Sequence, residues 1–363
     1  MLNKIFNIII CAFFSGSVIF SVESESHIRF YITSDVKGET EPCGWKKKPA
    51  GGLARKCTVV NNSIQEGFNT LILDAGNLFF KQDKIDPGVS LDVAKENANT
   101  IVSAFNYITC DGFSPGSKDF AAGVDYLKKL STDSNFDFIS CNIKDKDSQL
   151  LFKPYKIINK DGFRIGVVGA SSIFESDGVV VDEPFSSIKK IISSIQEQCD
   201  FILLLFSSSD SDYKKINLSN LDIDFAVRSS TRRKTSDGGK NSYPIYSLGD
   251  RGKVLYQFDF KYNDLSQSLV DLAYFNKSIK LETKRMENIA PDGDLSLKEK
   301  YRKNIIAYNS VINNAVNSLQ VKQITLDKTI QDNPFVLKVV DEGKIKTRNL
   351  GGPLEDPHRW HNH

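Results

Sequence analysis

LILDAGNLFF, from Leu71 to Phe80, begins as an apolar run that ends on an acid, a small residue and a glycine. This pattern is typical of a buried parallel strand that opens into a loop at its carboxyl end. Binding and catalytic groups of α/β proteins gather at that edge of the sheet. We therefore expect Asp74 and Asn77 to lie where a functional site would be.

Apolar runs and helical stretches alternate through the body of the chain. Strands are predicted at residues 29–33, 70–74, 136–140, 164–169, 201–206 and 225–227, and helices at 91–106 and 185–198 among others. From Pro244 onward the residues alternate inward and outward as in β-hairpins. The chain, with 40% hydrophobic residues, therefore has the pattern of an α/β protein with one large core.

Four further stretches are arranged around residues 71–80. They are IRFYITSDVKG (28–38), GGLARKCTVV (51–60), DGFSPGSKDFAAGVDYL (111–127) and LDIDFAVRSSTRRK (221–234). In this order and spacing, the chain resembles the 5′-nucleotidase branch of the calcineurin-like metallophosphoesterases between Ile28 and Tyr262. That family has the motifs TNDLHG, GGxAR, DAGD, GNHEFDxG, LSH and GHSH. The resemblance implies a two-sheet β-sandwich flanked by helices, followed here by a C-terminal helix.

The resemblance also implies a site for two divalent ions, which in the family activate a water and polarise a phosphoryl oxygen. Of the ligands, Asp35 is kept, and Asp74 and Asp119 supply two more carboxylates in the same motifs. The other ligand positions carry residues that differ from the family: Lys37, Asn77, Ser117, Lys118, Ser207, Ser230 and Arg232. We therefore expect no metal and no cofactor at this site.

The positions of the histidines support the same expectation. The chain has four, which are His27, His358, His361 and His363. A two-metal site built on imidazoles cannot form from a body that contains none. The three C-terminal histidines could bind a transition metal, but a polar chain end is the more common reason for such a pattern.

The basic replacements allow two interpretations. Four side chains could form a pocket for a phosphate or carboxylate anion: Lys37, Arg55, Lys118 and Arg232. Alternatively, the two lysines could neutralise the three carboxylates in an internal ion-pair cluster that takes the place of the metals. We favour the cluster, and both interpretations remain open at this point.

The predicted function is a non-catalytic binding or scaffold protein on a phosphoesterase-type fold. The alternative is a divergent metal-dependent phosphoesterase with a reduced carboxylate site, because a single Mg²⁺ or Ca²⁺ needs no histidine. We favour the non-enzymatic function because Asn77 offers a neutral amide where two cations would need an anion.

Residues 1–24 have the pattern of a secretory signal, with Lys4 before an apolar stretch and small residues at its end. We expect an exported protein, periplasmic or secreted, with no membrane span in the mature chain. The predicted divisions are a signal peptide (1–24), a metallophosphoesterase-like domain (25–280), a helical extension (281–340) and a flexible tail (341–363). A net charge of +2 gives no indication of a nucleic-acid partner.

A helix is predicted at residues 296–319, where Ser296 and Glu299 have the spacing of a capping box. Its apolar residues form one narrow seam: Tyr301, Ile305, Tyr308, Ile312, Ala315 and Leu319. The seam could pack on its own domain or dock a second protein chain.

The mature chain keeps five cysteines, and export would permit disulfides between them. They are Cys43, Cys57, Cys110, Cys141 and Cys199. The odd number leaves at least one thiol, and a bridge from Cys43 to Cys110 or Cys141 remains open.

Overall fold

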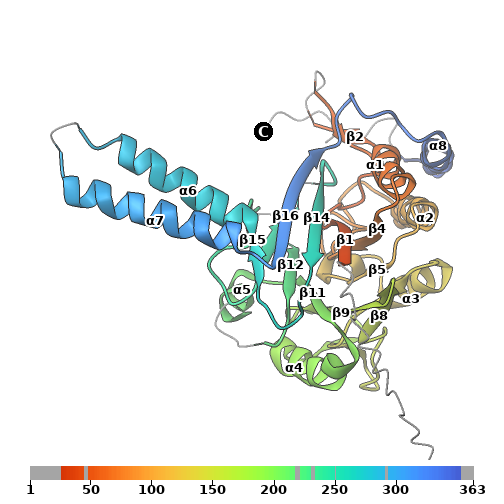
Figure 1. Cartoon of the computed structure of the whole chain (residues 1–363). Coiled ribbons are helices and arrows are strands. Elements are labelled where there is room, and N and C mark those ends of the chain that lie inside the picture. The colour runs from red at the N-terminus through yellow and green to blue at the C-terminus, as the bar shows by residue number, and fades with distance from the viewer. Residues whose placement is uncertain are drawn as a thin grey trace, which may run out of the picture.

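The computed structural model describes residues 26–44, 48–216, 221–229, 234–249, 251–290 and 293–352. Two β-sheets lie face to face in this part of the chain, and helices cover their outer faces (Figure 1). This confirms the predicted α/β sandwich flanked by helices. The predicted signal segment and the C-terminal histidines lie outside the described residues.

The first sheet has seven strands in the order β15-β16-β14-β1-β4-β5-β6. Its strands are β1 (Ser26–Thr33), β4 (Asn69–Asp74), β5 (Gly112–Phe113), β6 (Asp137–Phe138), β14 (Val254–Tyr262), β15 (Leu269–Asp271) and β16 (Asn317–Thr325). The predicted strand that ends at Asp74 is β4, and it pairs in parallel with β1 and β5. The carboxyl ends of these three strands therefore open at the same edge.

The second sheet has five strands in the order β13-β12-β11-β9-β8. They are β8 (Tyr155–Lys160), β9 (Phe163–Ser171), β11 (Phe201–Ser207), β12 (Phe225–Ser229) and β13 (Ile245–Leu248). All neighbours pair in parallel except β8 and β9. Two small sheets lie outside the sandwich, formed by β2 (Pro42–Cys43) with β3 (Ala50–Gly51) and by β7 (Ile143–Asp145) with β10 (Val179–Val181).

Alternation along the strands produces separate cores on the two faces of each sheet. Phe30 and Ile32 of β1 point between the sheets and share a core with Leu203 of β11. Tyr31 points the other way, into a core beneath helices. Successive side chains of a strand face opposite sides, so one apolar run can supply both cores.

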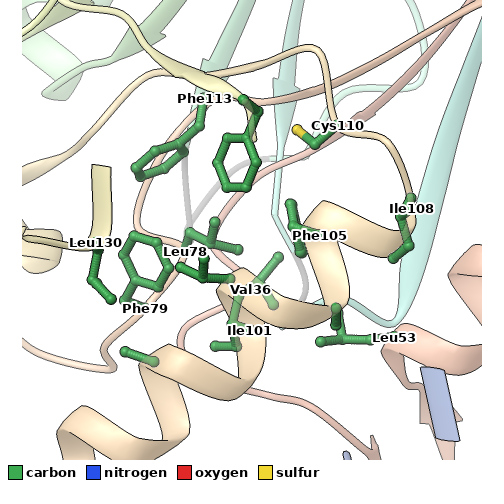
Figure 2. Close-up of a cluster of buried hydrophobic side chains, with 14 of the residues drawn as sticks. Val36, Leu53, Leu78, Phe79, Ile101, Phe105, Ile108, Cys110, Phe113 and Leu130 are labelled. Atoms are coloured by element: carbon green, nitrogen blue, oxygen red, sulfur yellow. The ribbon is translucent and has the colours of Figure 1, made fainter. Parts of the chain in front are cut away.

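The helices pack against the outer faces of the two sheets. Against the first sheet lie α1 (Leu53–Gln65), α2 (Leu91–Tyr107) and α3 (Val124–Asp133), and against the second lie α4 (Pro184–Ile195) and α5 (Asp210–Ile216). α8 (Pro334–Asn349) packs on the outside of α1 and α2. α2 begins at Ser90, whose side chain accepts the backbone N–H of Val93. Ile101, Phe105 and Ile108 then repeat at helical spacing and pack toward Phe113 of the sheet (Figure 2).

The predicted helix at 296–319 is wrong at both ends. α7 (Leu295–Asn313) is capped by Asp294, whose carboxylate accepts the N–H of Leu297, so Ser296 is not the cap. Beyond it, β16 pairs with β14 and β15, and Leu319 is buried between the sheets. The predicted helical extension therefore supplies a strand to the main sheet.

The seam of α7 packs on its own chain. α6 (Leu272–Glu287) and α7 form an antiparallel hairpin that projects from the sandwich (Figure 1). The rings of Phe275 and Tyr308 lie 5.9 Å apart between the two helices, and Asn304 Nδ2 donates to Glu282 Oε2 at 3.2 Å. The outer sides of both helices are left without a covering element in the described structure.

Among the described residues, the five cysteines form no disulfide with one another, so neither of the two possible bridges from Cys43 is made. Four of the thiols are buried, and Cys199 is partly exposed. Within the part of the chain that the structure describes, no helix combines the length and the apolar character needed to cross a membrane.

Candidate functional site

The candidate site lies where strands of both sheets end. Asp35 follows β1, Asn77 follows β4, and Lys118 belongs to a short 3₁₀ helix, η1 (Ser117–Phe120). The second sheet contributes Ser207 and Ser229. They lie side by side as the last paired residues of the parallel strands β11 and β12. Together these segments span more than 190 positions of the sequence, and the fold brings them to one edge.

Asn77 connects the segments of the site. Its amide nitrogen donates to Asp35 Oδ1 at 2.9 Å and to Ser229 Oγ at 3.3 Å, and its amide oxygen accepts the backbone N–H of Lys118 at 3.3 Å. Its φ of 56° is left-handed, a conformation that asparagine tolerates better than most residues. The side chain thus joins loops from both sheets by hydrogen bonds.

Gly116 allows the side chains of Ser207 and Asn77 to approach its backbone closely. A Cβ atom on this residue would overlap the hydroxyl of Ser207 and would lie 2.5 Å from Asn77 Oδ1. The loop before η1 can pass this close to β11 because the residue has no side chain. Ser207 and Asn77 therefore both lie against Gly116.

Two lysines lie next to Asp35 at the edge of the site. Burial raises the pKa of Asp35, and Lys37, the Asn77 amide and Lys118 oppose that shift. Burial lowers the pKa of Lys37 to about 8; Asp35 opposes this shift, and Lys118 and Arg251 add to it. Lys37 and Lys118 are therefore close neighbours, and both are half-buried.

The positive charges of Lys37 and Lys118 are not balanced by the single carboxylate of Asp35. Among the described residues, neither lysine has a carboxylate oxygen within 4.0 Å of its ammonium, and Asp35 Oδ2 is buried without a hydrogen-bond partner. Two ammonium groups beside one carboxylate give a local excess of positive charge. Such an arrangement is suited to an anion.

The other two carboxylates are satisfied in a different way, so the expected ion-pair cluster is wrong for them. Asp74 accepts the hydroxyl of Thr33 at 2.7 Å and the N–H of Gly76 at 2.9 Å. The charge beside it belongs to Lys56, whose Nζ donates to Thr33 Oγ1 at 3.0 Å. Burial raises the pKa of Asp74 to about 7, against the effect of Lys56.

Asp119 accepts hydrogen bonds from the backbone of the loops around the site. Its carboxylate accepts the N–H groups of Asn77 at 2.8 Å, Gly116 at 2.8 Å and Phe79 at 2.9 Å. Burial raises its pKa to about 6, and these N–H donors oppose the shift. The carboxylate therefore holds the loop after β4 and the loop before η1 together.

Some predicted site residues have other surroundings. The guanidinium of Arg55 donates to the carbonyl of Leu326 at 3.1 Å and lies 3.5 Å from Asp332, both near the C-terminal end of β16. The hydroxyl of Ser117 lies 3.4 Å from Asp83. Ser230 and Arg232 lie outside the described residues, directly after β12.

Sequence reasoning missed Lys56 and Ser229. Lys56 is buried on the inner face of α1, between Leu53 and Val60 in the helical repeat. A lysine on an otherwise apolar stripe is a signal of a buried partner, which here is Asp74. Ser229 is the last residue of β12, one position before the serine that the motif matched.

A two-metal centre does not fit this site. Among the described residues, no three His, Cys, Asp or Glu side chains come together in a way that could hold a metal ion. The side chain at the position of the bridging aspartate presents an amide N–H to Asp35, and an N–H group cannot bind a cation. Lys37 and Lys118 add positive charge beside Asp35, which would repel a cation at that carboxylate.

Comparisons with known proteins agree with this architecture. No protein-family model matches the chain. A 5′-nucleotidase from Vibrio parahaemolyticus is 30% identical over 134 residues, which make up 35% of this chain and 22% of that protein. The similarity to this curated relative therefore spans about a fifth of its length.

Two solved structures share the fold. A 5′-nucleotidase precursor from Thermus thermophilus has a TM-score of 0.63 at 14% identity, over 90% of this chain and 60% of that one. A calcineurin-like phosphoesterase from Bacillus subtilis has a TM-score of 0.59 at 15% identity, over 90% of this chain and 99% of that one. The chain therefore has the metallophosphoesterase fold, and its relatives are 5′-nucleotidases and calcineurin-like phosphoesterases.

Proposed function

We propose that this protein binds a small anion at the strand-end site and does not hydrolyse phosphoesters. The observation that carries the proposal is the pair formed by Lys37 and Lys118, two neighbouring ammonium groups with no carboxylate oxygen within 4.0 Å among the described residues. The two neighbouring ammonium groups repel each other, and an anion bound between them would offset that repulsion.

Hydrogen phosphate suits the surroundings of the pair better than a carboxylate does. Asp35 Oδ2 is buried and has no hydrogen-bond partner in the described structure, so it is an acceptor that lacks a donor. Hydrogen phosphate carries both anionic oxygens for the lysines and an O–H for such an acceptor. A carboxylate anion has no donor to offer.

Hydrolysis has no support from the residues present. The family reaction needs an anionic ligand between two cations, and Asn77 is neutral and occupied by its bonds to Asp35 and Ser229. Without that ligand, the site lacks the anionic bridge that would hold two cations and let them activate a water. We therefore expect no enzymatic rate on nucleotides or generic phosphoesters, with or without added Mn²⁺ or Zn²⁺.

Calorimetric titration with phosphate tests the binding. Lys118→Met and Lys37→Met should each weaken phosphate binding by about tenfold or more, because each removes one charge-assisted contact. Lys128→Met is the matched control, since Lys128 is exposed on α3 away from the site and should leave the affinity unchanged. Equal affinities for all four proteins, or no heat of binding for the wild type, would contradict the proposal.

A phosphoester hydrolysis assay tests the second part of the proposal, that the protein does not hydrolyse phosphoesters. Turnover of a nucleotide that requires divalent metal and is lost in Asp35→Ala would restore the alternative function, a divergent metal-dependent phosphoesterase. The absence of turnover together with phosphate binding is the expected result.

A further inference from the structure

The helical hairpin formed by α6 and α7, residues 272–313, is a second candidate surface. It projects from the sandwich, and its far end lies well away from the strand-end site (Figure 1). No residue of α7 is buried, and Glu282 is the one buried residue of α6. A hairpin that contributes so little to the core is free to meet something outside the protein.

The hairpin is basic within a chain that is nearly neutral. Residues 272–313 contain eight lysines and arginines against five acids, a net charge of +3, whereas the whole chain has +2. Attraction of this protein to an anionic partner must therefore come from a local region such as this one.

Most acids of the hairpin are already engaged. Glu282 accepts from Arg285 at 2.8 Å, Glu299 accepts from Arg302 at 2.7 Å, and Asp294 caps α7. Five lysines have no carboxylate within 4.0 Å among the described residues: Lys280, Lys284, Lys298, Lys300 and Lys303. Glu287 is the one described acid of the hairpin that shows no such contact. The uncompensated charge is therefore positive on both helices.

Large apolar side chains accompany these lysines. Leu295, the first residue of α7 at the far end of the hairpin, is 71% exposed, which is the highest value for a large hydrophobic side chain in the described structure. Ile306 is 61% exposed and follows Arg302 and Lys303 by one helical turn. Leu281 is 48% exposed and lies one turn before Arg285.

We propose that this hairpin docks onto an anionic lipid surface. Basic side chains attract acidic headgroups, and apolar side chains between them enter the interface, as in helices that lie on membranes. A flat surface can reach the end of a projecting hairpin without meeting the sandwich. The charge complementarity of the five lysines is the observation that selects this occupant.

Co-sedimentation of the full protein with vesicles tests the proposal. Binding is expected to phosphatidylcholine vesicles that contain phosphatidylglycerol, to fall as salt is raised, and to be absent with phosphatidylcholine alone. The triple variant Lys284→Glu, Lys300→Glu and Lys303→Glu should bind more than about tenfold more weakly. Leu295→Asn should weaken binding without changing its salt dependence.

A matched control distinguishes the effect of the hairpin lysines from the effect of the protein's net charge. Lys128→Glu, Lys189→Glu and Lys190→Glu change the net charge by the same amount on exposed positions of α3 and α4, and should bind like the wild type. Circular dichroism establishes that each variant is folded. An equal loss in both triple variants, or none in the hairpin variant, would overturn the proposal. Binding to soluble poly-glutamate that matches vesicle binding and ignores Leu295→Asn would assign the hairpin to an acidic protein instead.

Discussion

The amide nitrogen of Asn77 donates a 2.9 Å hydrogen bond to Oδ1 of Asp35 and so joins the loops that follow β4 and β1. In the family that this chain resembles, the corresponding pair is two metal-binding carboxylates. Here one partner is a donor and the other an acceptor, so the pair is stable without a cation between them. The loops keep their places through hydrogen bonds where the family uses metal.

Asn77→Asp should reverse this relationship. The variant loses the donor to Asp35 and places two carboxylates side by side, at a cost of about 2 kcal/mol in the free energy of unfolding at neutral pH. Urea unfolding measures the loss, which should shrink in mild acid because a shared proton restores a donor. Asn69→Asp is the control, since Asn69 bonds to Asp161 at the surface and should cost less than about 1 kcal/mol. A variant as stable as the wild type would show that the amide is not a structural link.

The stability of the protein should fall as pH rises toward neutrality, and Asp74 is one cause. Its pKa is raised to about 7 in the folded state, so between its ordinary value of about 4 and that pH the folded state holds the proton more strongly than the unfolded state. The stabilising effect is present in acid and is lost by about pH 7, with an upper bound of about 4 kcal/mol. Asp74→Asn should flatten this part of the pH profile of urea unfolding.

Asp137→Asn gives the opposite control. The pKa of Asp137 is lowered by Lys153 and Lys156, although burial opposes this, so its contribution is lost as pH falls through the folded-state value. This variant should leave the decline toward neutral pH in place. A profile unchanged by Asp74→Asn would contradict the assignment.

The hairpin should depend on Asp271 at its base. This buried carboxylate caps α6 at the N–H of Ala273 and also accepts Gly238 N–H at 2.6 Å and Tyr246 O–H at 2.9 Å. Asp271→Ala leaves these donors without a partner and should cost on the order of 3 kcal/mol. Asp294→Ala removes an exposed cap with one bond and should cost about 1 kcal/mol. Equal losses in thermal unfolding of the two variants would show that the contacts of Asp271 with the body contribute nothing.

Thiol labelling should separate Cys199 from the other cysteines. Burial raises the pKa of Cys57 to about 11 and that of Cys110 and Cys141 to about 12, and the thiolate is the reactive form. Under native conditions, Ellman's reagent should therefore modify Cys199 first, and the others after unfolding in urea. Fast native labelling of Cys110, or its protection after unfolding without reductant, would contradict the structure.

Local patterns of the sequence predicted most of the strands and helices. The strand predicted at residues 70–74 is β4, and the helix predicted at 91–106 is α2, because an apolar run or a helical repeat is a property of neighbouring residues. The end of the predicted helix at 296–319 was wrong for the same reason. Leu319 continues the helical spacing, but pairing with β14 and β15 gives it a place in a sheet that no local pattern reveals.

The sequence by itself determined which residue types could occupy the site, and therefore that imidazole ligands are missing from it. Only the tertiary structure decided which charge lies beside which. Asp74 lies beside Lys56 on α1 and not beside the lysines at the strand ends, and Asn77 bonds to Ser229, 152 positions away. The strength of an electrostatic or hydrogen-bond contact depends on distance in space, and the path of the chain through two sheets sets that distance.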